Sequence, residues 1–269
     1  MSDKRDASWR NPPIAYVVAE VVISPHYSLQ NHLPAIQQEL RAPFPRTAEA
    51  QALRLEIMGT ESMPQPQFDK VWQLYSGDNY LGAYLSPRAL ALHTTRYKHY
   101  EDFAQALGLL LRAVENSGLG AYVERIGLRY VDYLLPSDGH RPEDYLKQEL
   151  RGLTLEEGRR PENGAWGGTY QMAEGCAINL RVMAPAPAGN LLPPNFNAMP
   201  LAKPEVMTRA EQHYLLPGKP FGFADTDCVQ NIGKVLESAS LLTAFQQLHE
   251  YVSSTFRAAI SPLAEKEWF

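Results

Sequence analysis

Two opposite charges interrupt segments that otherwise have the composition of buried β-strands. Glu20 lies in the apolar run IAYVVAEVVIS, and Arg129 lies in the segment RIGLRYVDYLLP. A lone buried carboxylate is costly unless it has a partner or a raised pKa, and arginine does not readily lose its proton. We therefore predict that Glu20 and Arg129 form a buried ion pair between neighbouring strands. Such a pair either fixes the register of the strands or orients Arg129 to bind an anionic ligand.

Three aspartates are candidates for a second polar cluster. Asp225 and Asp227 in FGFADTDCVQ share one face of a strand, and Asp132 belongs to the RIGLRYVDYLLP segment. Clustered carboxylates can hold Mg²⁺ for phosphoryl chemistry. The Asp-x-Asp spacing is common, however, and such residues also accept backbone hydrogen bonds at a sheet end or neutralise an arginine. We therefore predict that Asp225 and Asp227 do not form a catalytic metal site.

Other catalytic and cofactor patterns are absent from the sequence. The seven histidines have no metal-ligand spacing, and there is no dinucleotide fingerprint, P-loop lysine or nucleophile elbow. Cys176 and Cys228 are too few for a disulfide framework or a zinc quartet, so they are interpreted as reduced thiols. The sequence therefore indicates no cofactor, no metal and no catalytic residue.

The composition is that of a globular protein. The chain has 269 residues, of which 45% are hydrophobic and 20% charged, and its formal net charge is −5. That charge argues against a general nucleic-acid surface but leaves a local basic patch open. The start of the chain lacks the layout of a signal peptide, and the apolar run is too short to cross a bilayer. We expect a cytoplasmic protein without membrane contact.

The pattern of apolar residues and turn residues predicts an α+β fold, with antiparallel sheets and helices packed on them. In residues 1–136 it indicates a strand at 14–23, a helix beginning at Asn31, an antiparallel meander, a helix from Tyr100 and a strand ending at Pro136. In residues 137–269 it indicates a short helix at 142–150, strands at 168–173, 176–183, 205–216 and 222–230, and a helix at 240–260. These ranges define two halves that are possible relics of a duplication.

Two features suggest contact with a protein partner. Residues 185–204 contain six prolines, which predicts an irregular arm outside the core, here called the proline-rich arm. Phe196 in this arm and the terminal Trp268 and Phe269 are large aromatic residues suited to docking, although a chain terminus can also tuck into the fold. The sequence leaves self-association open.

The chain resembles a sporadically distributed family of bacterial proteins for which no activity is established. The resemblance rests on Asn11-Pro12 before the strand with Glu20, on the Gly-Leu-Arg-Tyr motif at 127–130, on the Asp-x-Asp strand, and on the helix LHEYVSSTFRAAIS at 248–261. It spans nearly the whole chain, except that residues 184–204 look like an insertion. The patchy occurrence of the family implies an accessory role, for example in bacterial defence or mobile-element loci.

Three functional hypotheses follow. The first is a non-enzymatic accessory or regulatory subunit that binds a protein partner. The second is a metal-dependent phosphodiesterase or nuclease-like enzyme that uses Asp132, Asp225 and Asp227, with Arg129 on the phosphate. The third is a sensor that binds an anionic ligand at Arg129.

Overall fold

A single antiparallel sheet organises the molecule. The computed structural model describes residues 12–56, 65–137, 139–186, 192–193, 196, 198–215 and 220–268, and within them nine strands follow the order β2-β3-β4-β5-β1-β6-β9-β8-β7. The strands are β1 (Ile14–Ile23), β2 (Arg46–Glu56), β3 (Gln65–Tyr75), β4 (Leu81–Leu85), β5 (Ala89–Thr94), β6 (Tyr122–Leu134), β7 (Ala165–Ala173), β8 (Cys176–Met183) and β9 (Gly222–Val235). The predicted α+β class is confirmed, and β1 is the central strand of the sheet.

Helices lie on both faces of this sheet. They are α2 (Leu29–Leu40), α3 (Tyr100–Asn116), α4 (Glu205–Leu215), α5 (Ser238–Ala259) and α6 (Pro262–Trp268). Within the described residues, no helix is both long enough and apolar enough to span a bilayer. Residues 1–136 and 137–269 both contribute strands to the one sheet, where β6 pairs with β9 from Tyr122 to Leu134.

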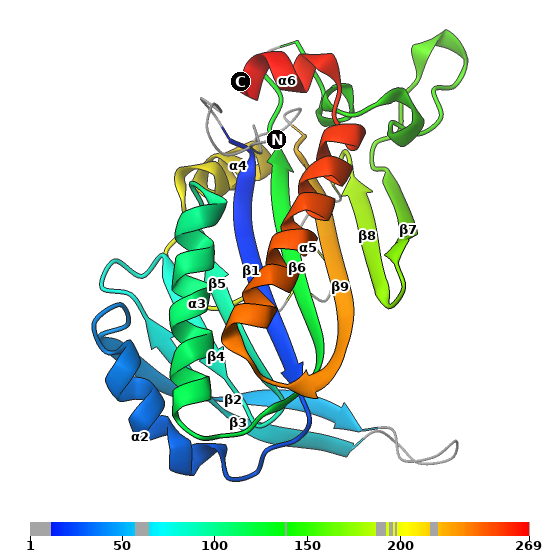
Figure 1. The fold of residues 1–269 in the computed structure, drawn as a ribbon. Helices are drawn as coiled ribbons and strands as arrows, with labels where there is room; N and C mark the ends of the chain where they lie inside the picture. The colour runs from blue at the N-terminus through cyan, green and yellow to red at the C-terminus, as the bar shows by residue number, and fades with distance from the viewer. Residues whose placement is uncertain are drawn as a thin grey trace.

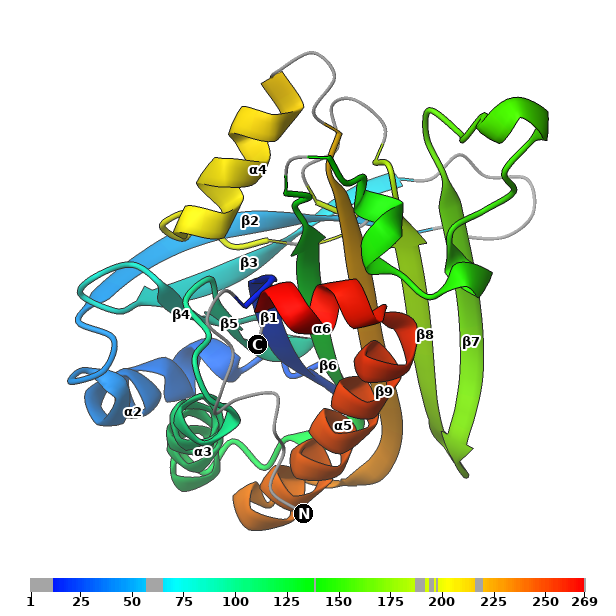
Figure 2. The ribbon, with the colours of Figure 1, turned by 90° about the horizontal axis from the view of Figure 1, so that it is seen from above.

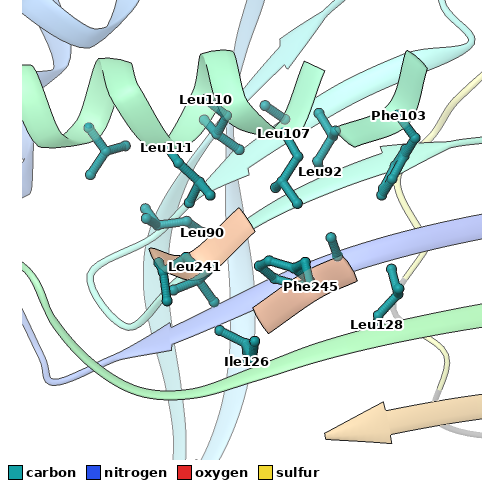
Figure 3. Packing of buried hydrophobic residues seen from close by; sticks show 14 of the residues in the cluster. Leu90, Leu92, Phe103, Leu107, Leu110, Leu111, Ile126, Leu128, Leu241 and Phe245 are labelled. Carbon is teal, nitrogen blue, oxygen red and sulfur yellow. The ribbon is translucent and has the colours of Figure 1, made fainter. Parts of the chain in front are cut away.

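The larger core lies between the sheet and the helices α3 and α5, which cross the same face (Figure 1). Leucines of α3 recur at three- and four-residue steps, so one side of this helix is apolar and packs downward on the strands. Figure 3 shows Leu107 and Leu111 of α3 near Leu90 and Leu92 of β5, with Phe245 of α5 beside them. All five side chains are buried.

The opposite face of the sheet is covered by α4 and by the proline-rich arm. Figure 2 shows α4 on the other side of the sheet from α3 and α5. Val206 and Ala210 of α4 pack on Tyr16 of β1 and on Val131 of β6. The sequence predicted a strand over 205–216, which is wrong: the four-residue spacing of Val206 and Ala210 is that of a helix face, and Pro204 precedes the first turn.

The arm has no regular element among its described residues, as its prolines predicted. It is not outside the core, however, because Met199 is only 5% exposed and Phe196 and Leu201 pack against the apolar cluster of this face. The Ala202 amide donates to the Asn79 carbonyl at 2.7 Å, and the Ala202 carbonyl accepts from the Thr95 hydroxyl at 2.6 Å. The arm therefore packs against β1 and the ends of the β4–β5 hairpin rather than projecting from the molecule.

Two further expectations concern the ends of helices. The first helix begins at Leu29, with Ser28 as the preceding cap residue instead of Asn31. At the C-terminus, the Trp268 side chain is 5% exposed and stacks on Tyr145 at 5.5 Å between ring centroids. Trp268 is therefore tucked into the fold, which is the other placement expected for it, while Phe269 lies outside the described residues.

The packing of α5 on the sheet gives a direct test of this core. We expect Phe245→Ala to lower the free energy of unfolding by about 3–5 kcal/mol, because the lost ring leaves a cavity under α3. Leu155→Ala is the control, since Leu155 is exposed in the segment before β7 and its truncation should cost about 0.5 kcal/mol or less. Urea denaturation of the two variants measures both values, and equal losses would contradict the assignment of this core.

Candidate functional site

Strand alternation places a set of charged side chains on the face away from α3 and α5. In β6, Leu128 and Tyr130 point into the larger core, so Arg129 between them points to the opposite face. Arg129 pairs with Asp227 in the register of β6 and β9, and Asp225 lies two residues further along the same face of β9. This arrangement brings the predicted residues Arg129, Asp225 and Asp227 together.

The strongest interaction of the site joins Arg129 to Asp225. Arg129 donates from Nε to Oδ1 at 2.6 Å and from Nη2 to Oδ2 at 2.8 Å, which is a bidentate pair. The Asp225 side chain is fully buried and that of Arg129 is 14% exposed. Arg181 of β8 approaches the same carboxylate at 3.5 Å, so Asp225 lies between two guanidinium groups.

The predicted buried pair between Glu20 and Arg129 is therefore not the one that the sheet forms. The Glu20 side chain is 48% exposed, and its ion pair is with Arg125 at 3.9 Å. Glu20 pairs with Gly127 in the register of β1 and β6, whereas Arg129 pairs with Val18. The offset of two residues leaves Arg129 closer to the carboxylate that β9 supplies.

Asp132 does not join the other two aspartates. It pairs with Ala224 in β9, and Ala224 belongs to the apolar cluster under α5 and α6. Asp132 thus lies on the helix-covered face, across the sheet from Asp225 and Asp227. In the part of the chain that the structure describes, no three His, Cys, Asp or Glu side chains come close enough to hold a metal ion.

A concave pocket of about 250 Å³ opens beside these charged residues. Strands β1, β3, β4, β5, β6 and β9 and the proline-rich arm line it. Its ionisable and hydrogen-bonding lining includes Glu20, Tyr84, His93, Arg125, Arg129 and Asp227. Phe196 and Met199 of the arm add an apolar wall, and the Phe196 ring lies 4.7 Å from the Arg129 guanidinium carbon.

Asp227 differs from Asp225 because it has no direct partner among the described residues, although Arg129, Arg181 and Arg125 lie near enough to lower its pKa in part. Among the described residues, its carboxylate makes no hydrogen bond and no ion pair, since Arg129 is bound to Asp225 and Arg125 approaches Glu20. Burial raises the pKa of Asp227 above its ordinary value of 3.8, and the nearby Arg129 opposes this rise only in part. Partial burial also raises the pKa of Glu20. Arg125 opposes this rise, and the negative charge of Asp227 adds to it.

A buried hydrogen-bond chain connects the arm to the pocket wall. The Met199 amide donates to the Tyr16 hydroxyl at 2.8 Å, and this hydroxyl lies 3.1 Å from Nδ1 of His93. Burial lowers the pKa of His93 to about 3, so the ring is neutral near pH 7. Because the Tyr16 proton needs an acceptor, we assign it to Nδ1, which leaves the imidazole proton of His93 on Nε2.

Comparison with known proteins adds no assignment to this geometry. The scan of protein-family models and the search of curated proteins each found no match. The site therefore has to be interpreted from its own contacts, distances and charges.

Several residues of the site escaped the sequence analysis. His93, Arg125 and Arg181 were not among the candidate site residues. The only sequence signal that they share with Arg129 is a polar residue at the alternate positions of an apolar strand. Phe196, expected to dock on a partner, instead packs its ring edge to face with Tyr16 at 4.9 Å.

The buried pair yields a second prediction. We expect Arg129→Ala to destabilise the fold by about 3–5 kcal/mol, because the buried Asp225 carboxylate loses its bidentate partner. Arg181→Ala is the matched control at the other side of the same carboxylate. Its side chain is 49% exposed, so its loss should cost about 1 kcal/mol or less. Chemical denaturation distinguishes the two, and an equal effect would show that Arg129 is not the main partner of Asp225.

Proposed function

We propose that the protein is a non-enzymatic accessory or regulatory protein that responds to a small ligand carrying a positively charged nitrogen group, an amine or a guanidinium. The pocket between β1, β6, β9 and the proline-rich arm is the binding site. The observation that carries the proposal is the Asp227 carboxylate, which lies in this pocket and makes no direct hydrogen bond or ion pair with the described residues, while burial raises its pKa.

The charges around the pocket favour a cation over an anion. Three carboxylates and three guanidinium groups are present, so the formal charges balance; they are Glu20, Asp225, Asp227, Arg125, Arg129 and Arg181. Arg129, which an anion would need, already gives two hydrogen bonds to Asp225. Asp227 and Glu20 keep acceptor atoms for a donor group, and a cation between them would relieve their mutual repulsion.

The shape of the pocket agrees with a ligand of modest size. Gly127 lies opposite Glu20 in the register and lines the floor, where a side chain would otherwise stand. A volume of about 250 Å³ suits a chain of a few heavy atoms with a charged head. Apolar atoms of Phe196 and Met199 can cover the aliphatic part of such a ligand.

The accessory role is supported by the resemblance to the sporadic bacterial family and by the absence of a catalytic pattern in the sequence. In this proposal the ligand supplies the regulatory signal and a protein partner receives it. Affinity capture from the native host, with and without the cationic probe, tests whether a partner binds in a ligand-dependent way.

The third prediction concerns ligand affinity. Agmatine, which carries an amine and a guanidinium, is the probe, with neutral n-pentanol and anionic glutarate as controls in calorimetry. We expect agmatine alone to bind, and Asp227→Asn to weaken it by about ten- to a hundredfold through loss of a charge-assisted hydrogen bond. Gly127→Val should block binding sterically without changing any charge. The variant should still fold, because a Cβ at this position meets only ordinary contacts, 3.6 Å from Val229.

The outcome that would overturn this function is equally specific. Preferential binding of glutarate would favour an anion sensor at Arg129, and equal affinity of Asp227→Asn and the wild type for agmatine would remove Asp227 from the site. No binding of any of the three probes would refute the cationic-nitrogen class.

The fourth prediction concerns pH and stability. Because the folded state raises the pKa of Asp227, ionising this carboxyl costs folding free energy once the pH exceeds the ordinary value of 3.8. Asp227→Asn removes that cost, so its melting temperature should exceed that of the wild type at pH 7, by about 2–4 °C for each kcal/mol removed. The difference should vanish in acid, where both side chains are neutral.

Agmatine affinity should rise with pH as Asp227 and Glu20 ionise.

Differential scanning calorimetry across pH measures this difference. A destabilised Asp227→Asn variant at pH 7 would mean that the carboxylate has a stabilising partner in the folded protein, contrary to the unpaired state inferred above.

A further inference from the structure

The strand β7 forms one edge of the sheet and lacks the features that usually protect an edge. Its sequence, AWGGTYQMA, has no charged residue and no proline, and its only irregularity is a bulge between Gln171 and Ala173 at the hairpin end. In Figures 1 and 2 no other described element runs alongside the outer side of β7. Alternate backbone N–H and C=O groups along that side therefore face away from β8 without a sheet partner.

Apolar side chains are also exposed in this region. Tyr170 on β7 is 47% exposed, and Leu153 and Leu155, in the segment leading into β7, are exposed as well. The rings of Trp166 and Tyr170 both lie over Gly168, since a Cβ built there would stand 2.7 Å from the Trp166 ring and 3.3 Å from the Tyr170 hydroxyl. The edge thus offers unpaired backbone together with an aromatic surface.

We propose that β7 pairs with β7 of a second copy of this chain, antiparallel and about a two-fold axis at Gly168. This register places Trp166 opposite Tyr170 of the second copy twice, which forms favourable cross-strand aromatic pairs on one face. Gly168 then faces Gly168, which leaves space for the four rings. On the other face Gly167 lies opposite Thr169, and no like charges meet anywhere between Ala165 and Gln171.

Self-pairing accounts for these features better than an unrelated strand does. A two-fold interface is self-complementary, so one strand must supply both halves of every pair. Trp166 and Tyr170, at equal distances on either side of Gly168, meet this condition. The proposal is independent of the ligand pocket, because none of the charged pocket residues lies on β7.

Analytical ultracentrifugation tests the proposal over about a hundredfold range of protein concentration, since a dimer shifts with concentration by mass action. The wild type should be in a concentration-dependent monomer–dimer equilibrium. The double variant G167E/T169E places glutamates opposite each other in both pairs and should be monomeric. The matched variant G167E/T169K places opposite charges there instead and should remain dimeric.

The two variants share the substitution at Gly167, where a Cβ has only ordinary contacts at 3.9 Å. Circular dichroism melts check that both fold. Should either fail to fold, Tyr170→Ser serves in their place, because it removes a half-exposed ring and should weaken the dimer at least severalfold. A wild type that stays monomeric, a dimer that persists in G167E/T169E, or a dimer lost from folded G167E/T169K would each overturn the proposal, as would a Tyr170→Ser dimer of unchanged affinity.

Discussion

The register of β6 with its two neighbours is the constraint on which the rest of the structure depends. Side chains alternate along β6, so Leu128 and Tyr130 enter the core under α3 and α5 while Arg129 faces the pocket. A slip of one residue would drive the guanidinium into the apolar core and expose the leucine. Since β1 and β9 both hydrogen-bond to β6 along this stretch, the core and the charged site are fixed by the same pairing.

The elements with strong periodicity could be predicted from the sequence, but which elements lie next to each other in the sheet could not. The spacing of the leucines in α3 and the Val- and Ile-rich composition of β1 each predict the element from its own residues. Which strands become adjacent is a non-local property, and this decided the partner of Arg129: Asp225 is 96 residues away, on a strand that the first half of the sequence cannot reveal. Residues 205–216 were misassigned because their helical spacing rests on few apolar residues, chiefly Val206 and Ala210, and is therefore a weak signal.

The prolines of the arm predict its local structure but not its place in the fold. They correctly exclude regular structure, because proline cannot donate a backbone hydrogen bond. They carry no information on whether the segment projects or packs. Here the Met199 amide and the Ala202 backbone find partners on β1 and around β4–β5, so the arm is irregular and yet integral to the face that holds the pocket.

Some polar groups of this protein have partners within the fold and others do not, and both of our binding proposals rest on this contrast. Asp225 has two guanidinium partners and is fully buried, so it has no capacity left for a ligand. Asp227, two residues away, has the same chemistry but makes no direct contact with a cation among the described residues. Burial raises its pKa, so keeping it ionised opposes folding. Among the described residues, the outer N–H and C=O groups of β7 likewise have no strand partner. A group that costs folding free energy in isolation gains most from a partner of complementary chemistry, which we propose to be a cation for Asp227 and the β7 strand of a second copy for β7.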